Sequence, residues 1–83
     1  MKLARVTGTV TATAKDARLV GLKLLTCDLT DGTGTVVAAD TIGAGQGDEV
    51  LVAFGSAARM PASTSGAPVD AAVTAIVDPE QSG

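Results

Sequence analysis

Hydrophobic and polar residues alternate along much of this chain, which is the pattern of β-strands that bury one face. In residues 5–14, threonines at 7, 9, 11 and 13 alternate with small apolar residues, namely Val6, Gly8, Val10, Ala12 and Ala14. This period of two predicts a first strand with one apolar face. Similar patterns predict four further strands, over residues 19–29, 35–40, 49–54 and 69–77. The alanines of the last segment leave a helix as its alternative.

Turn-forming residues separate the predicted strands. The Asp-Gly pair within residues 30–34 supplies the positive-φ positions of a hairpin loop. Three glycines alternate within residues 43–48, and glycine lets a backbone turn tightly or approach another backbone closely. The sequence therefore predicts a tight loop before the fourth strand.

A short helix is predicted between the fourth and fifth strands. Residues 55–60 contain two alanines and favour one helical turn, with Ser56 as its N-cap and Pro61 ending it. The small residues 62–67 predict a mobile loop after this turn.

Five short strands with one helical turn predict a mainly β fold, a small five-stranded β-barrel similar to an OB-fold and partly open. Residues 1–78 are expected to form a single domain, and residues 79–83 a flexible C-terminal tail.

The composition indicates a core that is thin for a free-standing domain. The chain has 83 residues and is 46% hydrophobic, but it contains one Phe and neither Trp nor Tyr. Burial of a small side chain contributes little stabilising free energy, because each Å² of buried apolar surface contributes roughly 25 cal/mol. The single cysteine excludes an internal disulfide. Burial between subunits is the remaining route to stability, so the composition itself predicts an oligomer.

The net charge of −3 argues against nucleic acid and against anionic membrane surfaces as partners. A barrel that binds single-stranded nucleic acid would need stacking aromatic residues in a basic groove, and this chain offers Phe54 alone. The chain shows neither a signal peptide nor an apolar run of roughly 20 residues, so a cytosolic protein is expected.

The glycine-rich segment does not fit a nucleotide-binding loop. Such a loop opens a helix whose N-terminus holds the phosphate, whereas here a strand is predicted to follow. No lysine occupies the position that a phosphate-binding P-loop requires. A structural hinge or a subunit-contact loop is the preferred interpretation of residues 43–47.

The remaining candidate residues also favour structural roles, and the sequence predicts no catalytic residue, cofactor or metal site. The chain has no histidine, and the spacing of its main carboxylates matches no calcium loop, so they are interpreted as turn residues or caps: Asp40, Asp48, Glu49 and Asp70. Asp70 could pair with Arg59 or accept backbone N–H groups.

Two further features are open to a functional interpretation. Cys27 lies on a predicted strand and is interpreted as a buried inert thiol, because no histidine can activate it. Lys15, Arg18 and Lys23 form either an edge that meets another protein or a solvated turn, and the sequence does not choose between them.

Several blocks in order resemble one known family over residues 1–78. They are MKLARVTGTV at residues 1–10, LVGLKLL at 19–25, VAADTIGAG at 37–45, GSAAR at 55–59 and PVDAAV at 68–73. Together they are similar to the pentameric vertex proteins of bacterial microcompartments, the EutN/CcmL family. This resemblance implies an OB-like barrel assembled as a ring-shaped homopentamer that caps the vertices of a polyhedral shell.

The resemblance also implies partners and contact residues. The partners would be other copies of the chain and hexameric and trimeric shell proteins, with no nucleic acid, no membrane, no cofactor and no catalysis, inside a cytoplasmic microcompartment. The loop from Ile42 to Gly47 is expected near the five-fold axis, and the Gly55–Arg59 turn and the last strand at subunit contacts. The residues expected at these contacts are Ile42, Gly43, Ala44, Gly45, Gly47, Gly55, Ser56, Arg59 and Asp70.

Two other classes of function stay open at this point. A small OB-like module that binds a ligand or partner would need a pocket with convergent polar groups, and a small enzyme would need a base or a metal set. Subunit number separates these classes from a vertex protein, which must form a five-membered ring.

Overall fold

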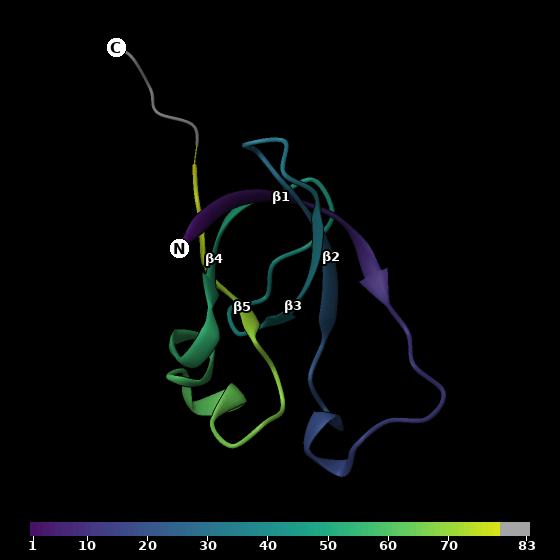
Figure 1. The fold of residues 1–83 in the computed structure, drawn as a ribbon. Coiled ribbons are helices and arrows are strands. Elements are labelled where there is room, and N and C mark those ends of the chain that lie inside the picture. The colour runs from purple at the N-terminus through teal and green to yellow at the C-terminus, as the bar shows by residue number, and fades with distance from the viewer. Residues whose placement is uncertain (79–83) are drawn as a thin grey trace.

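The computed structural model of the protein describes residues 1–78, and the predicted flexible tail at 79–83 lies outside these residues. Figure 1 shows the strands curving around one another, with short helical turns at one end. In chain order, the elements are β1 (Lys2–Val10), the 3-10 helix η1 (Ala17–Leu19), β2 (Leu24–Leu29), β3 (Thr35–Asp40), β4 (Glu49–Phe54), the 3-10 helices η2 (Gly55–Arg59) and η3 (Ala62–Thr64), and β5 (Ala71–Ile76).

The strands form a closed barrel in the order β1-β2-β3-β5-β4. β1 pairs with β4 over residues 2–5 and with β2 over residues 4–10, and the β1–β2 pairing has a register shift between Val6 and Gly8. The prediction of a partly open barrel is corrected by the parallel pairing of β3 with β5. Two registered pairs make this closure, Ala39 with Ala72 and Asp40 with Val73.

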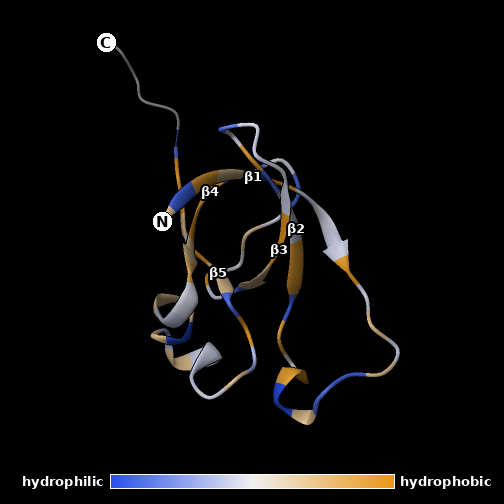
Figure 2. Ribbon diagram, in the orientation of Figure 1, coloured by the Kyte–Doolittle hydropathy of each residue, from blue (hydrophilic) through white to orange (hydrophobic). Residues whose placement is uncertain are grey.

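The core is built from small side chains, as the composition indicates. Its members are Ala4, Val6, Leu25, Cys27, Ala38, Ala44, Val50, Val52, Ala71 and Val73. Leu25 is the largest side chain that is fully buried. In Figure 2 much of the hydrophobic colour lies along the strands, while the connecting segments are mixed, pale or blue in places and orange at η1. Cys27 is buried as predicted, and this burial, with the nearby charges of Asp28 and Asp40, raises the pKa of its thiol.

The first two strands begin and end at different residues from those predicted. β1 starts at Lys2 and ends at Val10, so the alternating threonines after it, residues 11–14, belong to no strand. β2 starts only at Leu24 because the preceding residues form η1 and a turn. The Asp16 carboxylate accepts the backbone N–H of Arg18 at 2.8 Å, which fixes that 3-10 turn.

The third and fourth strands have the predicted bounds, and the fifth is shorter than predicted. β5 begins at Ala71, two residues later than expected, and three consecutive residues at its start are buried. The helix η2 contacts both β4 and β5, so the outer side of this end of the sheet is covered as well as the inner side. Burial on both sides explains why apolar residues here do not alternate with polar ones.

The connection between β4 and β5 differs from the prediction in two respects. Ser56 is not a helix N-cap: η2 begins at Gly55, and the cap position is held by Phe54 without a side-chain hydrogen bond. The loop at residues 62–67, expected to be mobile, contains η3 and the fully buried Thr64. The Thr64 hydroxyl donates to the carbonyl oxygen of Ala58 at 2.6 Å, so one buried side chain fixes this connection.

Removing the Thr64 hydroxyl is expected to destabilise the fold. In Thr64→Val the shape is kept but the Ala58 carbonyl loses its donor, so the free energy of unfolding should fall by about 1–3 kcal/mol. Thr64→Ser, which keeps the hydroxyl, is the matched control and should lose less. Urea unfolding of both variants at one protein concentration measures the difference, and equal losses would contradict the role of the hydroxyl.

Candidate functional site

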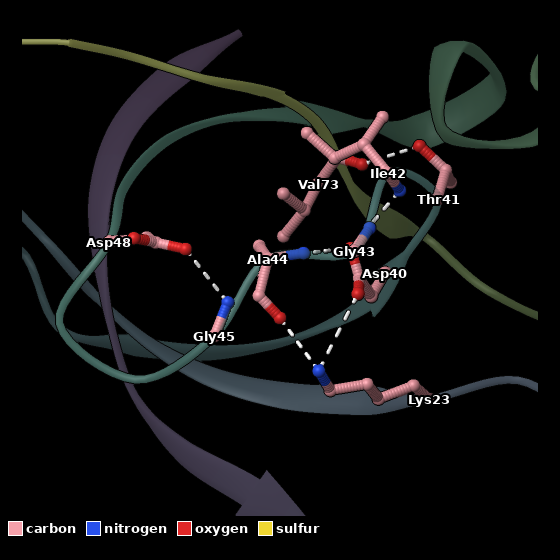
Figure 3. Close-up of polar contacts among 9 residues, drawn as sticks. All are labelled: Lys23, Asp40, Thr41, Ile42, Gly43, Ala44, Gly45, Asp48 and Val73. Carbon is pink, nitrogen blue, oxygen red and sulfur yellow. Dashed lines mark hydrogen bonds and ion pairs between the residues drawn. The ribbon is translucent and has the colours of Figure 1, made fainter.

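The segment between β3 and β4, residues 41–48, is called the glycine loop here, and the carboxylate of Asp40 organises its first half. One carboxylate oxygen, Oδ1, accepts the backbone N–H groups of Ile42 at 3.2 Å, and of Gly43 and Ala44 at 3.1 Å each. Figure 3 shows these groups converging on Asp40. The Asp40 side chain is only 4% exposed, so the interpretation of this residue as a hydrogen-bonding cap is confirmed.

Lys23 holds the same part of the loop from the opposite side. Its Nζ donates to the carbonyl oxygen of Ala44 at 2.7 Å and lies 3.8 Å from Oδ2 of Asp40 (Figure 3). The partly buried charge of Asp40 therefore has a cation beside it. Arg18, by contrast, forms an ion pair with Asp16 at 2.9 Å, and its hydrogen bonds hold the pKa of that carboxyl well below the usual range.

The second half of the loop is attached to β1. The backbone N–H of Gly47 donates to the carbonyl oxygen of Val6 at 2.8 Å, and Arg5 donates from Nη1 to the carbonyl oxygen of Gly47 at 3.0 Å. Within the loop, Oδ2 of Asp48 accepts the N–H of Gly45 at 2.9 Å (Figure 3). Asp48 is thus a second cap, as the sequence indicates.

The loop also completes the barrel. Ala44 is fully buried and belongs to the core, although it lies in a segment without regular secondary structure. Thr41 donates from its hydroxyl and its backbone N–H to the carbonyl oxygen of Val73, at 2.7 and 3.4 Å. These contacts extend the short β3–β5 pairing into the glycine loop. The closed barrel therefore depends on the shape of this loop.

Two of the three loop glycines are required by the backbone of the subunit itself, and one is not. Gly43 and Gly47 have φ angles of 83° and 91°, which favour glycine. Gly45 does not have a positive φ, and a Cβ atom built on it would meet no heavy atom within 4 Å. Among residues 1–78, neither the backbone conformation nor a close neighbour requires glycine at position 45.

The hydrogen bonds of the loop disfavour phosphate binding. The backbone N–H groups at residues 42–45, 47 and 48 all donate to acceptors within the chain, and strand β4 follows in place of a helix. A phosphate-binding loop needs such donors to be free. Within residues 1–78 no group of three potential metal ligands is present. The same residues include no helix with the length and apolar character of a membrane span.

The other predicted contact residues lie around η2 and the segment before β5. Gly55 has a φ of 63°, and its N–H donates to the carbonyl oxygen of Asp70 at 2.9 Å. Arg59 donates to the carbonyl oxygen of Val69 at 2.8 Å. Of the two possibilities for the Asp70 carboxylate, pairing with Arg59 or accepting backbone N–H groups, neither is found among the described residues. Ser56 and Asp70 are exposed.

Sequence reasoning missed the residues that hold the glycine loop from outside. Lys23 and Arg5 come from segments about 20 and 40 residues away in the chain, and both bind loop carbonyl groups. Their spacing carries no local signal, because the contact arises only when the barrel closes.

Comparison with known proteins gives consistent matches over nearly the whole chain. The family model described as ethanolamine utilisation protein EutN/carboxysome matches residues 1–78. The carboxysome shell vertex protein CcmL of Thermosynechococcus vestitus is 49% identical, over 94% of this chain and 84% of that protein. The CcmL structure from Nostoc sp. PCC 7120 superposes with a TM-score of 0.89 at 48% identity, covering 94% of this chain and 89% of that one.

A further similar structure is described as pentameric. The GrpN pentameric microcompartment shell protein from Rhodospirillum rubrum superposes with a TM-score of 0.84 at 40% identity. The match covers 98% of this chain and 99% of the GrpN chain.

Loss of the Asp40 carboxylate is expected to destabilise the glycine loop. Asp40→Ala leaves three backbone N–H groups without their acceptor, of which that of Ala44 is buried, so the free energy of unfolding should fall by about 1–3 kcal/mol. Asp40→Asn keeps one side-chain oxygen as acceptor and should lose less. Urea unfolding, together with amide hydrogen exchange at residues 42–44, checks this order, which equal exchange in the two variants would contradict.

Proposed function

The chain belongs to the ethanolamine utilisation protein EutN/carboxysome family, and from that premise we propose that it forms ring-shaped homopentamers that cap the vertices of a polyhedral bacterial microcompartment. The main support for this function is that nearly the whole chain matches shell vertex proteins in sequence and in fold. One of the similar shell proteins is described as pentameric. These relatives do not favour the alternative of a small ligand- or partner-binding module.

The proposed role is structural and non-enzymatic. A flat sheet of hexagonal tiles cannot close into a polyhedron, and pentagonal units at the corners supply the missing curvature. The partners in this role are four further copies of the chain and the hexameric and trimeric shell proteins around each vertex. The protein would reside in the shell of a cytoplasmic microcompartment.

Within the ring, the glycine loop is assigned to the five-fold axis. The support for this assignment is Gly45, because no backbone strain and no close neighbour in the described part of the chain calls for a glycine there. Small residues let backbones from neighbouring chains approach one another closely. The exposed Ile42 and Gly43 lie on the same loop, whose conformation is set by Asp40 and Lys23.

The η2 turn and the last strand are assigned to contacts between subunits. Gly55, Ser56, Arg59 and Asp70 are all exposed in the single chain. The backbone bonds at Gly55 and Arg59 tie this turn to the segment before β5, so it offers a fixed surface to a neighbour.

The first test is the mass of the native particle. Native mass spectrometry should show a species near 40.5 kDa, five times the 8.1 kDa of one chain. Mixing this species with hexameric shell proteins should then give closed particles in electron micrographs. A monomer of 8.1 kDa over a wide concentration range would overturn the proposed vertex function.

Gly45 tests the place of the glycine loop. In Gly45→Trp the new side chain enters open space in the single chain, so folding should be kept while five crowded backbones cannot accept it. The expected result is a folded monomer by native mass spectrometry and circular dichroism. Thr33→Trp, in the exposed hairpin turn between β2 and β3, is the control and should stay pentameric. An intact pentamer of Gly45→Trp would contradict the proposed position of the glycine loop at the five-fold axis.

A further inference from the structure

A closed ring of identical subunits needs two different surfaces on each chain, because each subunit contacts its two neighbours head to tail. The inference that follows rests on the proposed pentamer and identifies those two surfaces. Candidate surfaces are groups of apolar side chains on the outside of the barrel that are at least partly open to solvent. The single chain carries such side chains on both sides of the barrel.

The first surface is a groove on the outside of β2 and β3. It has a volume of about 200 Å³ and is lined by Leu19, Leu24, Val37, Ala39 and the residues 68–71. Val37, on the outer face of β3, is 48% exposed at this groove. A neighbouring cavity shares residues 68–70 with the groove and adds Arg18 and Arg59, so the predicted contact residues Arg59 and Asp70 border this surface.

The second surface is an apolar row on the outside of β1, β4 and β5. Leu3 pairs across the strands with Leu51, and Leu51 pairs with Ala75, so the three side chains lie side by side. They alternate with the buried Ala4 and Val50, which places the row on the outer face. Leu3 is 41% exposed, and Leu51 and Ala75 beside it are partly exposed.

The groove and the row lie on opposite sides of the barrel. Figure 1 shows β2 and β3 across the barrel from β4 and from the start of β1. Opposite sides of one chain can face its two neighbours in a ring, so this placement suits a head-to-tail contact.

We propose that the apolar row of one chain, centred on Leu3, docks into the groove beside Val37 of the next chain, and that five such contacts close the ring. The occupant of the groove is a second copy of this chain, because only a head-to-tail contact between unlike faces generates a ring. The apolar area that the small core cannot supply is then buried between subunits.

Two charge substitutions test this pairing. Val37→Glu places a carboxylate in the groove, and Leu3→Glu places one in the row, at positions where the single chain leaves each side chain open to solvent. Each variant alone should be a monomer by native mass spectrometry, because every contact in its ring contains the altered face. An equimolar mixture should form a heterodimer near 16 kDa, since one pair of intact faces remains.

Formation of the heterodimer would show that both variants are folded, so that their failure to form rings alone comes from the altered surfaces. Ser63→Glu adds the same charge at an exposed site in η3 outside both surfaces and should remain a ring. Either variant remaining pentameric alone, or a mixture of folded chains that gives only monomers or rings, would overturn the inference. If circular dichroism shows that a variant is unfolded, Val37→Gln or Leu3→Gln replaces it in the same mixture.

The outcomes also distinguish this inference from the proposed function. A pentameric parent chain with pentameric Val37→Glu and Leu3→Glu would overturn the pairing and leave the vertex function standing. A parent chain that is itself a monomer would overturn both.

Discussion

The closure of the barrel depends on the buried carboxylate of Asp40. The parallel pairing of β3 with β5 has two registered residue pairs, and the glycine loop with Ala44 completes the enclosure. Folding the loop back onto the barrel turns three consecutive N–H groups toward its interior side, and Asp40 accepts all three. An N–H group without an acceptor is costly where water cannot reach it, as at the buried Ala44, so this one side chain supports both the loop and the closed core.

The first and last residues of a strand are predicted well from the sequence where turn residues flank the strand. They are predicted poorly where the strand pairs with a segment far away in the chain. β3 and β4 are flanked by glycines and aspartates, and their predicted bounds are confirmed. β1 begins earlier than predicted because Lys2 and Leu3 become strand residues only through pairing with β4, about 50 residues away. The alternation of residues 11–14 was misleading because a two-residue period without a partner strand makes no sheet.

In the candidate site, too, contacts between residues close in the chain could be predicted, and contacts between distant segments could not. The caps at Asp40 and Asp48 could be predicted because each carboxylate binds N–H groups within four residues of itself. The role of Lys23, and the contact of Arg59 with Val69, depend on how separate segments meet in space. Thr64 was assigned to a mobile loop because a threonine among small polar residues gives no indication that it will be fully buried.

The fixed shape of the glycine loop has a consequence for the kinetics of assembly. Its N–H groups are bonded within one chain, so a subunit reaches a neighbour with this loop already ordered. Association then loses little conformational entropy in the loop, which lowers the free-energy cost of binding. Ring formation becomes a sequence of encounters between rigid bodies, with rates set by diffusion and orientation instead of by a folding step coupled to binding.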